Sequence, residues 1–178
     1  MTNASEAAFK KKLGLQPLNF GPIDAAREVV IPDAVPLDDR LWIPQEPNLW
    51  IRPLLLCASR GYWVTLLRSK KAGILSRHRH PQPVHGYVIK GTWRYLEHDW
   101  IATEGGYVYE PPGETHTLVM GDGVDEMITL FQVNGAMIYL GPEGELAGYD
   151  DVHTKIEQAR EHYEKVGIGA AYVDGIIR

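Results

Sequence analysis

The sequence contains a single cysteine, Cys57, among 178 residues. One thiol cannot form a disulfide within the chain, which excludes the small secreted folds that depend on disulfides. No apolar run approaches the roughly 20 residues that a membrane-spanning helix needs. The first residues, MTNASE, lack the charged-then-apolar order of a secretory signal. We therefore expect a cytoplasmic protein that does not contact a membrane.

The sequence also lacks any block of like charge. Its 18 basic and 23 acidic residues give a net charge of −5 that is spread along the chain, which argues against a nucleic-acid partner. It contains no Gly-x-Ser-x-Gly elbow and no glycine-rich phosphate loop between a strand and a helix, so neither a serine hydrolase nor a nucleotide-binding enzyme is indicated. A hydrophobic content of 44% over this length suits one domain with a real core.

Short strand-like runs separated by turn residues fill the middle of the chain. Asn134-Gly135, between two apolar runs, is the strongest hairpin signal among these turns. Many evenly spaced short strands predict an all-β sandwich or barrel. The predicted strands are 49–57, 61–68, 73–78, 84–90, 92–98, 106–110, 116–120, 126–133 and 136–140.

The two ends of the chain have a different character. Residues 1–48 predict a short helix at 5–13 followed by a proline-rich arm with a short strand at 29–31. Residues 49–145 predict the barrel. Residues 146–178 predict a helix and a tail that is either an extended arm or a frayed end, all within one structural domain. Apolar residues at helical spacing and Asp150 or Asp151 as the cap indicate that last helix, which ends at Gly167. The arm and the apolar strands predict a homodimer or homotetramer.

The residues with the clearest chemistry are three histidines. In a strand, side chains two apart point to the same side, so His78 and His80 are expected to aim at one point. His116 follows the turn Pro111-Pro112-Gly113, which redirects the chain toward the same place. Three neutral nitrogens without a thiolate suit a borderline divalent metal that keeps open coordination positions, and both iron(II) and zinc fit this ligand set.

Three further residues are candidates for the same site. Glu110 immediately precedes the turn before His116, where a buried carboxylate could take a proton from a substrate or orient a metal-bound water, so we consider it the candidate catalytic residue. Tyr95 and His85 are candidates for the substrate pocket. His85 is also a possible replacement metal ligand, although its offset by one position predicts that it points to the opposite face of its strand.

Two segments resemble the two conserved sequence blocks of the cupin barrels. His78-Arg79-His80 followed by Gly91 resembles the first block, and Gly105, Pro111, Gly113 and His116 match the second position by position. The resemblance covers roughly residues 50 to 140 and implies a jelly-roll-like barrel. The chain departs from the pattern at two positions, because the glutamate ligand of the first block falls on Val84 and the closing asparagine on Met120.

At closer range, segments 80–87, 91–100 and 109–118 resemble a cupin subgroup that includes acetylacetone-cleaving enzymes and, more similar still, the 2,4′-dihydroxyacetophenone dioxygenases. This resemblance implies a non-haem iron(II) enzyme of aromatic compound catabolism, with metal ligands at His78, His80 and His116. It would use dioxygen as co-substrate to cleave the side chain of an aromatic α-hydroxyketone into 4-hydroxybenzoate and formate.

Other functions remain open at this stage. The same ligands would serve a β-diketone-cleaving cupin oxygenase. A non-catalytic metal-binding sensor domain is a candidate of a different class, because related cupins occur in anti-sigma regulators. A sugar isomerase or epimerase would call for a more polar pocket than the aromatic-rich central strands indicate.

Overall fold

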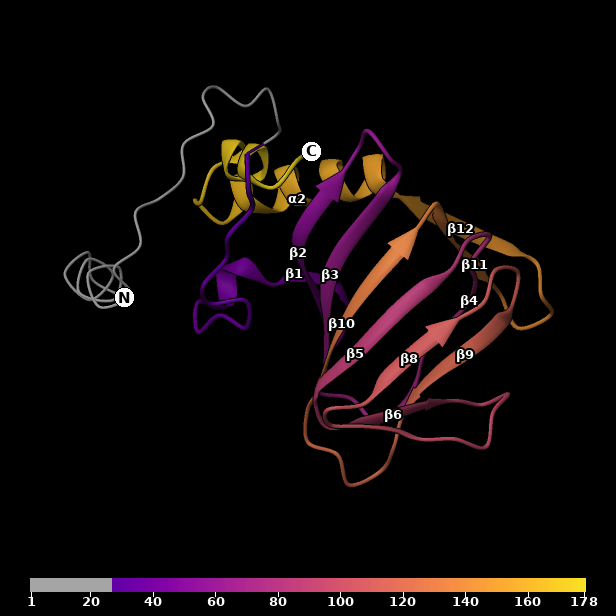
Figure 1. The fold of residues 1–178 in the computed structure, drawn as a ribbon. Helices are drawn as coiled ribbons and strands as arrows, with labels where there is room; N and C mark the ends of the chain where they lie inside the picture. The colour runs from indigo at the N-terminus through magenta and orange to yellow at the C-terminus, as the bar shows by residue number, and fades with distance from the viewer. Residues whose placement is uncertain (1–26) are drawn as a thin grey trace, which may run out of the picture.

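Two antiparallel β-sheets form the body of the computed structural model, which describes residues 27–178 (Figure 1). The strands are β1 (Ile43–Glu46), β2 (Leu49–Cys57), β3 (Tyr62–Ser69), β4 (Gly73–Arg79), β5 (Val84–Lys90), β6 (Thr92–Tyr95), β7 (Ala102–Thr103), β8 (Tyr107–Glu110), β9 (Thr115–Met120), β10 (Met127–Asn134), β11 (Ala136–Leu140) and β12 (Leu146–Asp151). A 3-10 helix η1 (Asp39–Leu41) precedes them, and the helix α2 (Val152–Lys165) and the 3-10 helix η2 (Ala170–Gly175) follow.

The strands divide equally between the two sheets. Sheet A has the order β1-β2-β3-β10-β5-β8, and sheet B has the order β12-β11-β4-β9-β6-β7. One core cluster joins their facing sides, with Trp63 and Phe131 contributed by sheet A and Trp93 and Leu118 by sheet B. This arrangement confirms the predicted all-β barrel.

The nine predicted strands are all present, and eight of them agree within one residue at each end. The exception is the run at 92–98, which stops at Tyr95. Beyond that point the chain turns, because the His98 amide donates to the Tyr95 carbonyl and the Glu97 carboxylate accepts hydrogen bonds from the Thr117 amide and hydroxyl. A side chain that bonds to another strand in this way is not visible in a hydrophobic pattern.

Three strands were not predicted, namely β1, β7 and β12. Two of them, β1 and β12, extend the sheets beyond the predicted barrel bounds of 49–145. Each has a composition that weakens a strand signal, since β1 contains Pro44 and β12 contains Gly148 and two aspartates. The short strand predicted at 29–31 does not form. The predicted helix at 5–13 lies outside the described residues.

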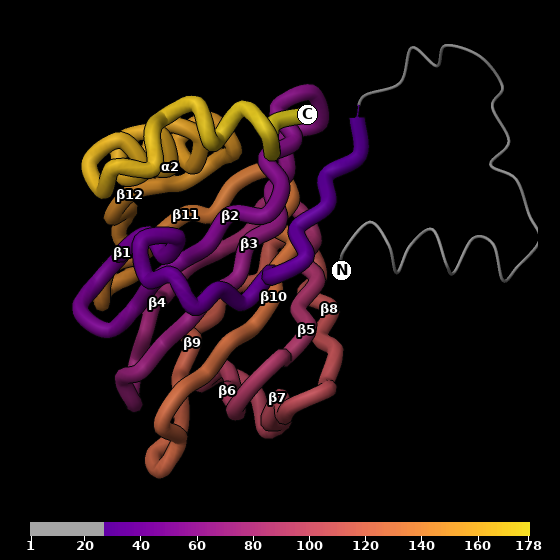
Figure 2. Tube along the Cα trace, turned by 90° about the vertical axis from the view of Figure 1, so that its left-hand side faces the viewer, coloured from indigo at the N-terminus to yellow at the C-terminus, as the bar shows by residue number. Residues whose placement is uncertain are grey.

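The helix at the C-terminal end forms as predicted and covers one end of the barrel (Figure 2). Asp151 is the N-cap, and its side chain accepts hydrogen bonds from the His153 and Thr154 amides in a capping box. Val152, Ala159 and Tyr163 form the buried face. Within residues 27–178 no helix combines the length and apolar character needed to cross a bilayer.

The tail after this helix was predicted to be an extended arm or a frayed end, and it is neither. It folds back as η2, and Ile177 then pairs with Leu56 in a parallel bridge. The Leu56 amide donates to the Ile176 carbonyl, and the Arg178 amide donates to the Leu56 carbonyl. The chain end is therefore bonded to β2.

The turn between β5 and β6 predicts one stability effect. Gly91 has φ +74°, and an added Cβ would lie against the carbonyl oxygen of Glu126. Gly91→Ala should lower the free energy of unfolding by about 1–3 kcal/mol, because both the backbone conformation and the contact are unfavourable for a side chain. Chemical denaturation measures this. Gly121→Ala is the control, since its Cβ meets nothing within 4 Å, and equal stability of the two variants would contradict the prediction.

Candidate metal centre

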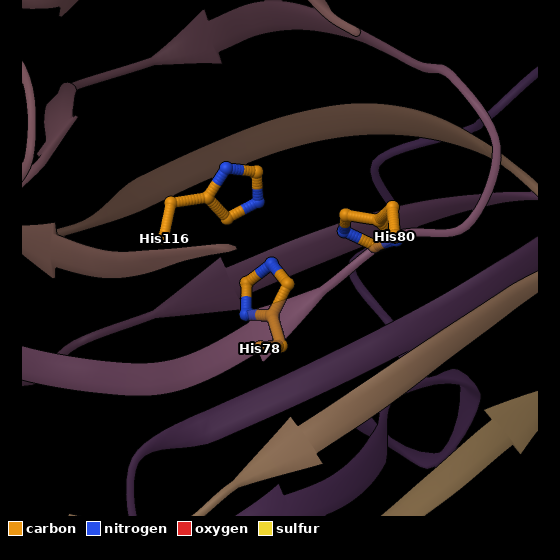
Figure 3. Close-up of side chains that lie close together, drawn as sticks. All are labelled: His78, His80 and His116. Carbon is orange, nitrogen blue, oxygen red and sulfur yellow. The ribbon is translucent and has the colours of Figure 1, made fainter. Parts of the chain in front are cut away.

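Strand register brings the three predicted histidines together. His78 on β4 lies directly opposite His116 on β9, so both side chains point into the barrel from sheet B. His80 follows two residues later, just past the end of β4. The exposed fraction of these side chains is 3% or less. Each offers one ring nitrogen within 4.8 Å of the others (Figure 3), an arrangement that can bind a metal ion.

Neighbouring groups hold each ring in place. The Ser76 hydroxyl lies 3.0 Å from His78 Nδ1, and the Ala136 carbonyl oxygen lies 3.3 Å from His80 Nδ1. The His116 ring is stacked on Tyr95, with centroids 3.8 Å apart and planes 4° from parallel. Bonding at Nδ1 leaves the Nε2 atoms of His78 and His80 available, which is how a second shell commonly orients metal-binding histidines.

Glu110 points into the same space from the opposite sheet. Its Oε2 atom lies 3.4 Å from His116 Nε2 and 3.7 Å from His80 Nε2. Its Oε1 atom accepts a hydrogen bond of 2.6 Å from the Tyr95 hydroxyl. Glu110 pairs with Val84 across β5 and β8, the position at which the cupin pattern expects a glutamate. The carboxylate of this site therefore comes from the neighbouring strand.

Burial determines the charge state of these groups. It lowers the pKa of His80 to about 4 and that of His116 to about 3. The pKa of His78 is also lowered well below its usual value, first by burial and then by His80 and His116. Burial raises the pKa of Glu110 to about 7, although the hydrogen bond from Tyr95 acts in the opposite direction. At neutral pH the three imidazoles are therefore uncharged, which is the form that binds metals.

The polar atoms of the site fit a divalent cation. Among the described residues, buried side-chain atoms without a hydrogen-bond partner include Glu110 Oε2 and both ring nitrogens of His116. Burying such groups without a partner is costly. A borderline divalent metal would satisfy the donors that converge here, and neutral imidazoles suit iron and zinc alike.

A cavity of about 580 Å³ adjoins the site, with His78, His80 and Glu110 in its wall. Tyr95 lines it together with apolar side chains such as Trp63, Leu118 and Phe131. His85 is not among the lining residues. It pairs with Gln132 and Tyr109 on the outer side of sheet A, and its Nδ1 lies 2.7 Å from the Tyr107 hydroxyl. The assignment of His85 to the pocket is corrected accordingly, because it is one position out of phase with the inward-facing Val84 and Gly86.

Sequence reasoning missed several residues of the cavity wall. Tyr139 lies opposite His78 across β11 and β4 and thus shares its face. Asp150 and Lys155 are buried in the same wall. The Asn134-Gly135 turn, which sets the path of β11, is a sequence signal for Tyr139. No comparable signal marks Lys155, because an isolated lysine on an amphipathic helix is normally exposed.

Two facing antiparallel sheets that hold a histidine cluster between them, with a His-x-His pair at the end of one strand, define a cupin. The family model described as the ChrR cupin-like domain matches residues 32–138, and the chain belongs to this family.

Solved structures share the fold. An RmlC-like cupin protein from Ralstonia eutropha JMP134 is 27% identical over 70% of this chain and 82% of its own, with a TM-score of 0.65. An acetylacetone dioxygenase from Acinetobacter johnsonii is 13% identical over 79% of this chain and 97% of its own, also with a TM-score of 0.65. At that identity the likeness shows the fold alone. A search of curated proteins finds no match to this chain.

The convergence of the histidines predicts the effect of removing one of them. His116→Ala should lower the metal content of the purified protein from about one ion per chain to a trace, because two imidazoles hold a divalent ion far less tightly than three. Elemental analysis for iron and zinc measures this. His85→Ala is the matched control and should keep its metal, since this ring is not part of the histidine cluster and bonds to Tyr107 instead. Full metal content in His116→Ala would contradict the ligand assignment.

The raised pKa of Glu110 predicts a pH effect on the metal-free protein. Between about pH 4.5 and pH 7 the carboxyl is protonated in the folded state but ionised in the unfolded state, so stability falls as the pH rises through this window. Glu110→Gln cannot ionise and should therefore become more stable than the wild type by up to about 3 kcal/mol above pH 8. Urea unfolding at pH 5 and pH 8.5 measures this, and a stability difference that does not change with pH would refute it.

Proposed function

We propose that this protein is an iron(II)-dependent dioxygenase that cleaves the side-chain carbon–carbon bond of an aromatic α-hydroxyketone. The reaction would convert 2,4′-dihydroxyacetophenone and dioxygen to 4-hydroxybenzoate and formate. The observation that carries the proposal is the unpartnered Glu110 Oε2 within 3.4–3.7 Å of two buried histidine nitrogens. A candidate base and two of the three candidate metal ligands, His78 and His80, thus line one cavity.

The cavity suits a small aromatic ketone. Its volume of about 580 Å³ lies within the range of roughly 300–1,000 Å³ typical of small-molecule sites. Apolar side chains from both sheets line it, among them Val84, Leu118 and Phe131. Such walls bury an aromatic ring and exclude water from the reacting atoms.

His78, His80 and His116 would hold the iron. When bound, iron(II) supplies Lewis acidity toward the oxygen atoms of the ketone and the redox chemistry that dioxygen requires.

Glu110 would act as the general base. In the proposed reaction its Oε2 takes the proton from the carbon that carries the hydroxyl group, which converts the α-hydroxyketone to an electron-rich enolate and leaves Glu110 protonated. Burial raises the pKa of Glu110 to about 7, and a dication at the histidines would lower it, so the carboxylate would be ionised and able to accept a proton at neutral pH. Because Oε1 is held by the Tyr95 hydroxyl, the carboxylate is fixed with Oε2 toward the histidines.

Tyr95 would position two parts of the site at once. Its hydroxyl holds Glu110, while its ring lies flat on His116. Its own pKa is raised well above the usual value, first by burial and then by the charge of Glu110. The phenol therefore stays protonated at neutral pH and remains a hydrogen-bond donor.

Two other functions have specific support. The Acinetobacter johnsonii acetylacetone dioxygenase shares the fold, which favours β-diketone cleavage as the second candidate. The family description, ChrR cupin-like domain, favours a metal-binding sensor domain as the third.

Oxygen uptake by the iron(II)-loaded protein separates these functions. With 2,4′-dihydroxyacetophenone we expect uptake of one dioxygen per 4-hydroxybenzoate formed, and little uptake with acetylacetone. Labelled dioxygen should deliver one atom to each product. Uptake with acetylacetone alone would assign the diketone reaction. A protein that is isolated with zinc, and takes up no oxygen with either compound after iron loading, would be assigned to the sensor class.

The same assay tests the base. Glu110→Gln should retain its iron but lose a factor of about 10²–10⁴ in kcat, the usual contribution of a positioned general base. Glu104→Gln is the control, since this carboxylate is exposed and does not line the cavity. Unchanged turnover in Glu110→Gln would show that the carboxylate does not take part.

A further inference from the structure

A second polar cluster lies in the wall of the same cavity. It consists of Gln45 on β1, Tyr139 on β11, Asp150 on β12, and Lys155 and Gln158 on α2. The exposed fraction is 5% for Asp150 and 4% for Lys155. Charged residues are rarely this buried unless they are paired. Here the pair forms part of a surface that a bound molecule would touch.

The hydrogen bonds of this cluster are short at Asp150 and longer between Lys155 and two glutamine side chains. Asp150 is fully engaged: Oδ2 accepts from Lys155 Nζ at 2.6 Å and from the Tyr139 hydroxyl at 2.7 Å, while Oδ1 accepts from Gln158 Nε2 at 2.9 Å and from the Thr154 hydroxyl at 3.0 Å.

Lys155 has two weaker contacts in addition. Its Nζ lies 3.2 Å from Gln45 Oε1 and 3.3 Å from Gln158 Oε1, longer than the usual 2.9–3.0 Å. Gln45 and Gln158 are half-buried, and their amide nitrogens donate to the Pro44 carbonyl and to Asp150 Oδ1. The contacts that a ligand could replace most easily are therefore the two long ones between Lys155 Nζ and the amide oxygens.

Tyr139 links this position to the histidine site. It lies opposite His78 across β11 and β4, and its hydroxyl reaches Asp150. One phenol ring thus extends from β11, the neighbour of the strand that carries His78, to the polar cluster. A ligand ring that lies alongside Tyr139, with its ketone end at the histidines, would direct its far substituent toward Lys155.

We propose that Lys155, together with Gln45 and Gln158, binds a neutral hydroxyl group at the far end of an aromatic ligand. This rests on the proposed function, because it places the ketone end of the ligand at the histidines. The hydroxyl accepts a hydrogen bond from Lys155 Nζ and donates one to the oxygen of Gln45 or Gln158. It thus takes the place of the long contact between Lys155 and that amide. A carboxylate at this position would be repelled by Asp150, whereas a bare ring would offer Lys155 no acceptor.

The far end of the cavity is built by a separate part of the chain. Asp150, Lys155 and Gln158 lie beyond residue 138, where the match to the family model ends. The histidines and Glu110 lie within it. Two of the three residues of the proposed hydroxyl site, Lys155 and Gln158, therefore lie outside the part of the chain that the family model describes, whereas Gln45 lies within it.

Ligand binding tests this assignment without turnover. The full chain, loaded with redox-inert zinc, is titrated calorimetrically with 4-hydroxyacetophenone and with acetophenone, which differ only in the ring hydroxyl. The wild type should bind the hydroxylated ligand at least tenfold more tightly, the effect expected of a hydrogen bond to a charged group. Lys155→Met should reduce this ratio to about one. Glu157→Gln, an exposed neighbour on α2, should leave it unchanged.

Removing the lysine in Lys155→Met leaves Asp150 buried without its ion pair, which can prevent folding. A second variant keeps the proposal testable in that case. The double variant Gln45→Leu, Gln158→Leu keeps the ion pair and should reduce the ratio at least threefold. Equal affinity of the wild type for both ligands, or a ratio that survives in every folded variant, would overturn the assignment and leave the cluster with only the role of holding α2.

The outcome is separable from that of the proposed reaction. A preference for the hydroxylated ligand that depends on Lys155, together with no oxygen uptake by the iron form, would support the hydroxyl site and refute the proposed reaction. Oxygen uptake without this preference would support the reaction and refute the hydroxyl site.

Discussion

The pairing of β4 with β9 is the constraint on which the site depends. This register places His78 opposite His116, and a slip of one residue would send one of the two rings to the outer face of sheet B. A hydrogen bond of 2.7 Å from the Gly113 amide to the His80 carbonyl ties the Pro-Pro-Gly turn to the end of β4. His80 is thereby held beside the strand that carries His116. The metal-ligand set is thus a property of backbone pairing before it is a property of side chains.

The electrostatics of the centre follow from this enclosure. Burial keeps the three imidazoles uncharged and raises the pKa of the nearby carboxyl to about 7. The usual cupin carboxylate position is occupied by Val84, and its cross-strand neighbour Glu110 supplies a carboxylate instead. The acidic group is thus retained within the barrel, but it reaches the histidines from a different strand and with one oxygen held by Tyr95.

Much of the barrel could be predicted from the sequence, because alternation and turn residues are local signals. The same holds for the histidines. The spacing of His78 and His80 predicts that they share a face, and the turn before His116 predicts that the chain returns to them. Strand phase placed His85 on the outside, as its offset from Val84 indicated, although it had also been considered for the pocket. Tyr95 and Glu110 could be selected as candidates, but their hydrogen bond depends on which strands pair.

The far wall of the cavity could not be predicted for a related reason. Gln45 and Lys155 are 110 residues apart in the sequence, and only the docking of α2 against the barrel brings them into contact. The strands that frame this wall, β1 and β12, contain proline and glycine and give weak local signals. The chain end, predicted to be an extended arm or a frayed end, was likewise fixed by non-local bonds to β2.

The docking of α2 on the barrel also has an evolutionary consequence. The groups proposed to carry out the reaction are confined to the segment from β4 to β9, whereas most of the residues at the far wall follow β11. If the proposed assignments hold, mutations in the terminal helix would change which molecules bind while the histidines and Glu110 stay intact. Sequence divergence among descendants of such a barrel would be concentrated in this last segment. A change of substrate would then require few substitutions and would leave the groups proposed to carry out the reaction unchanged.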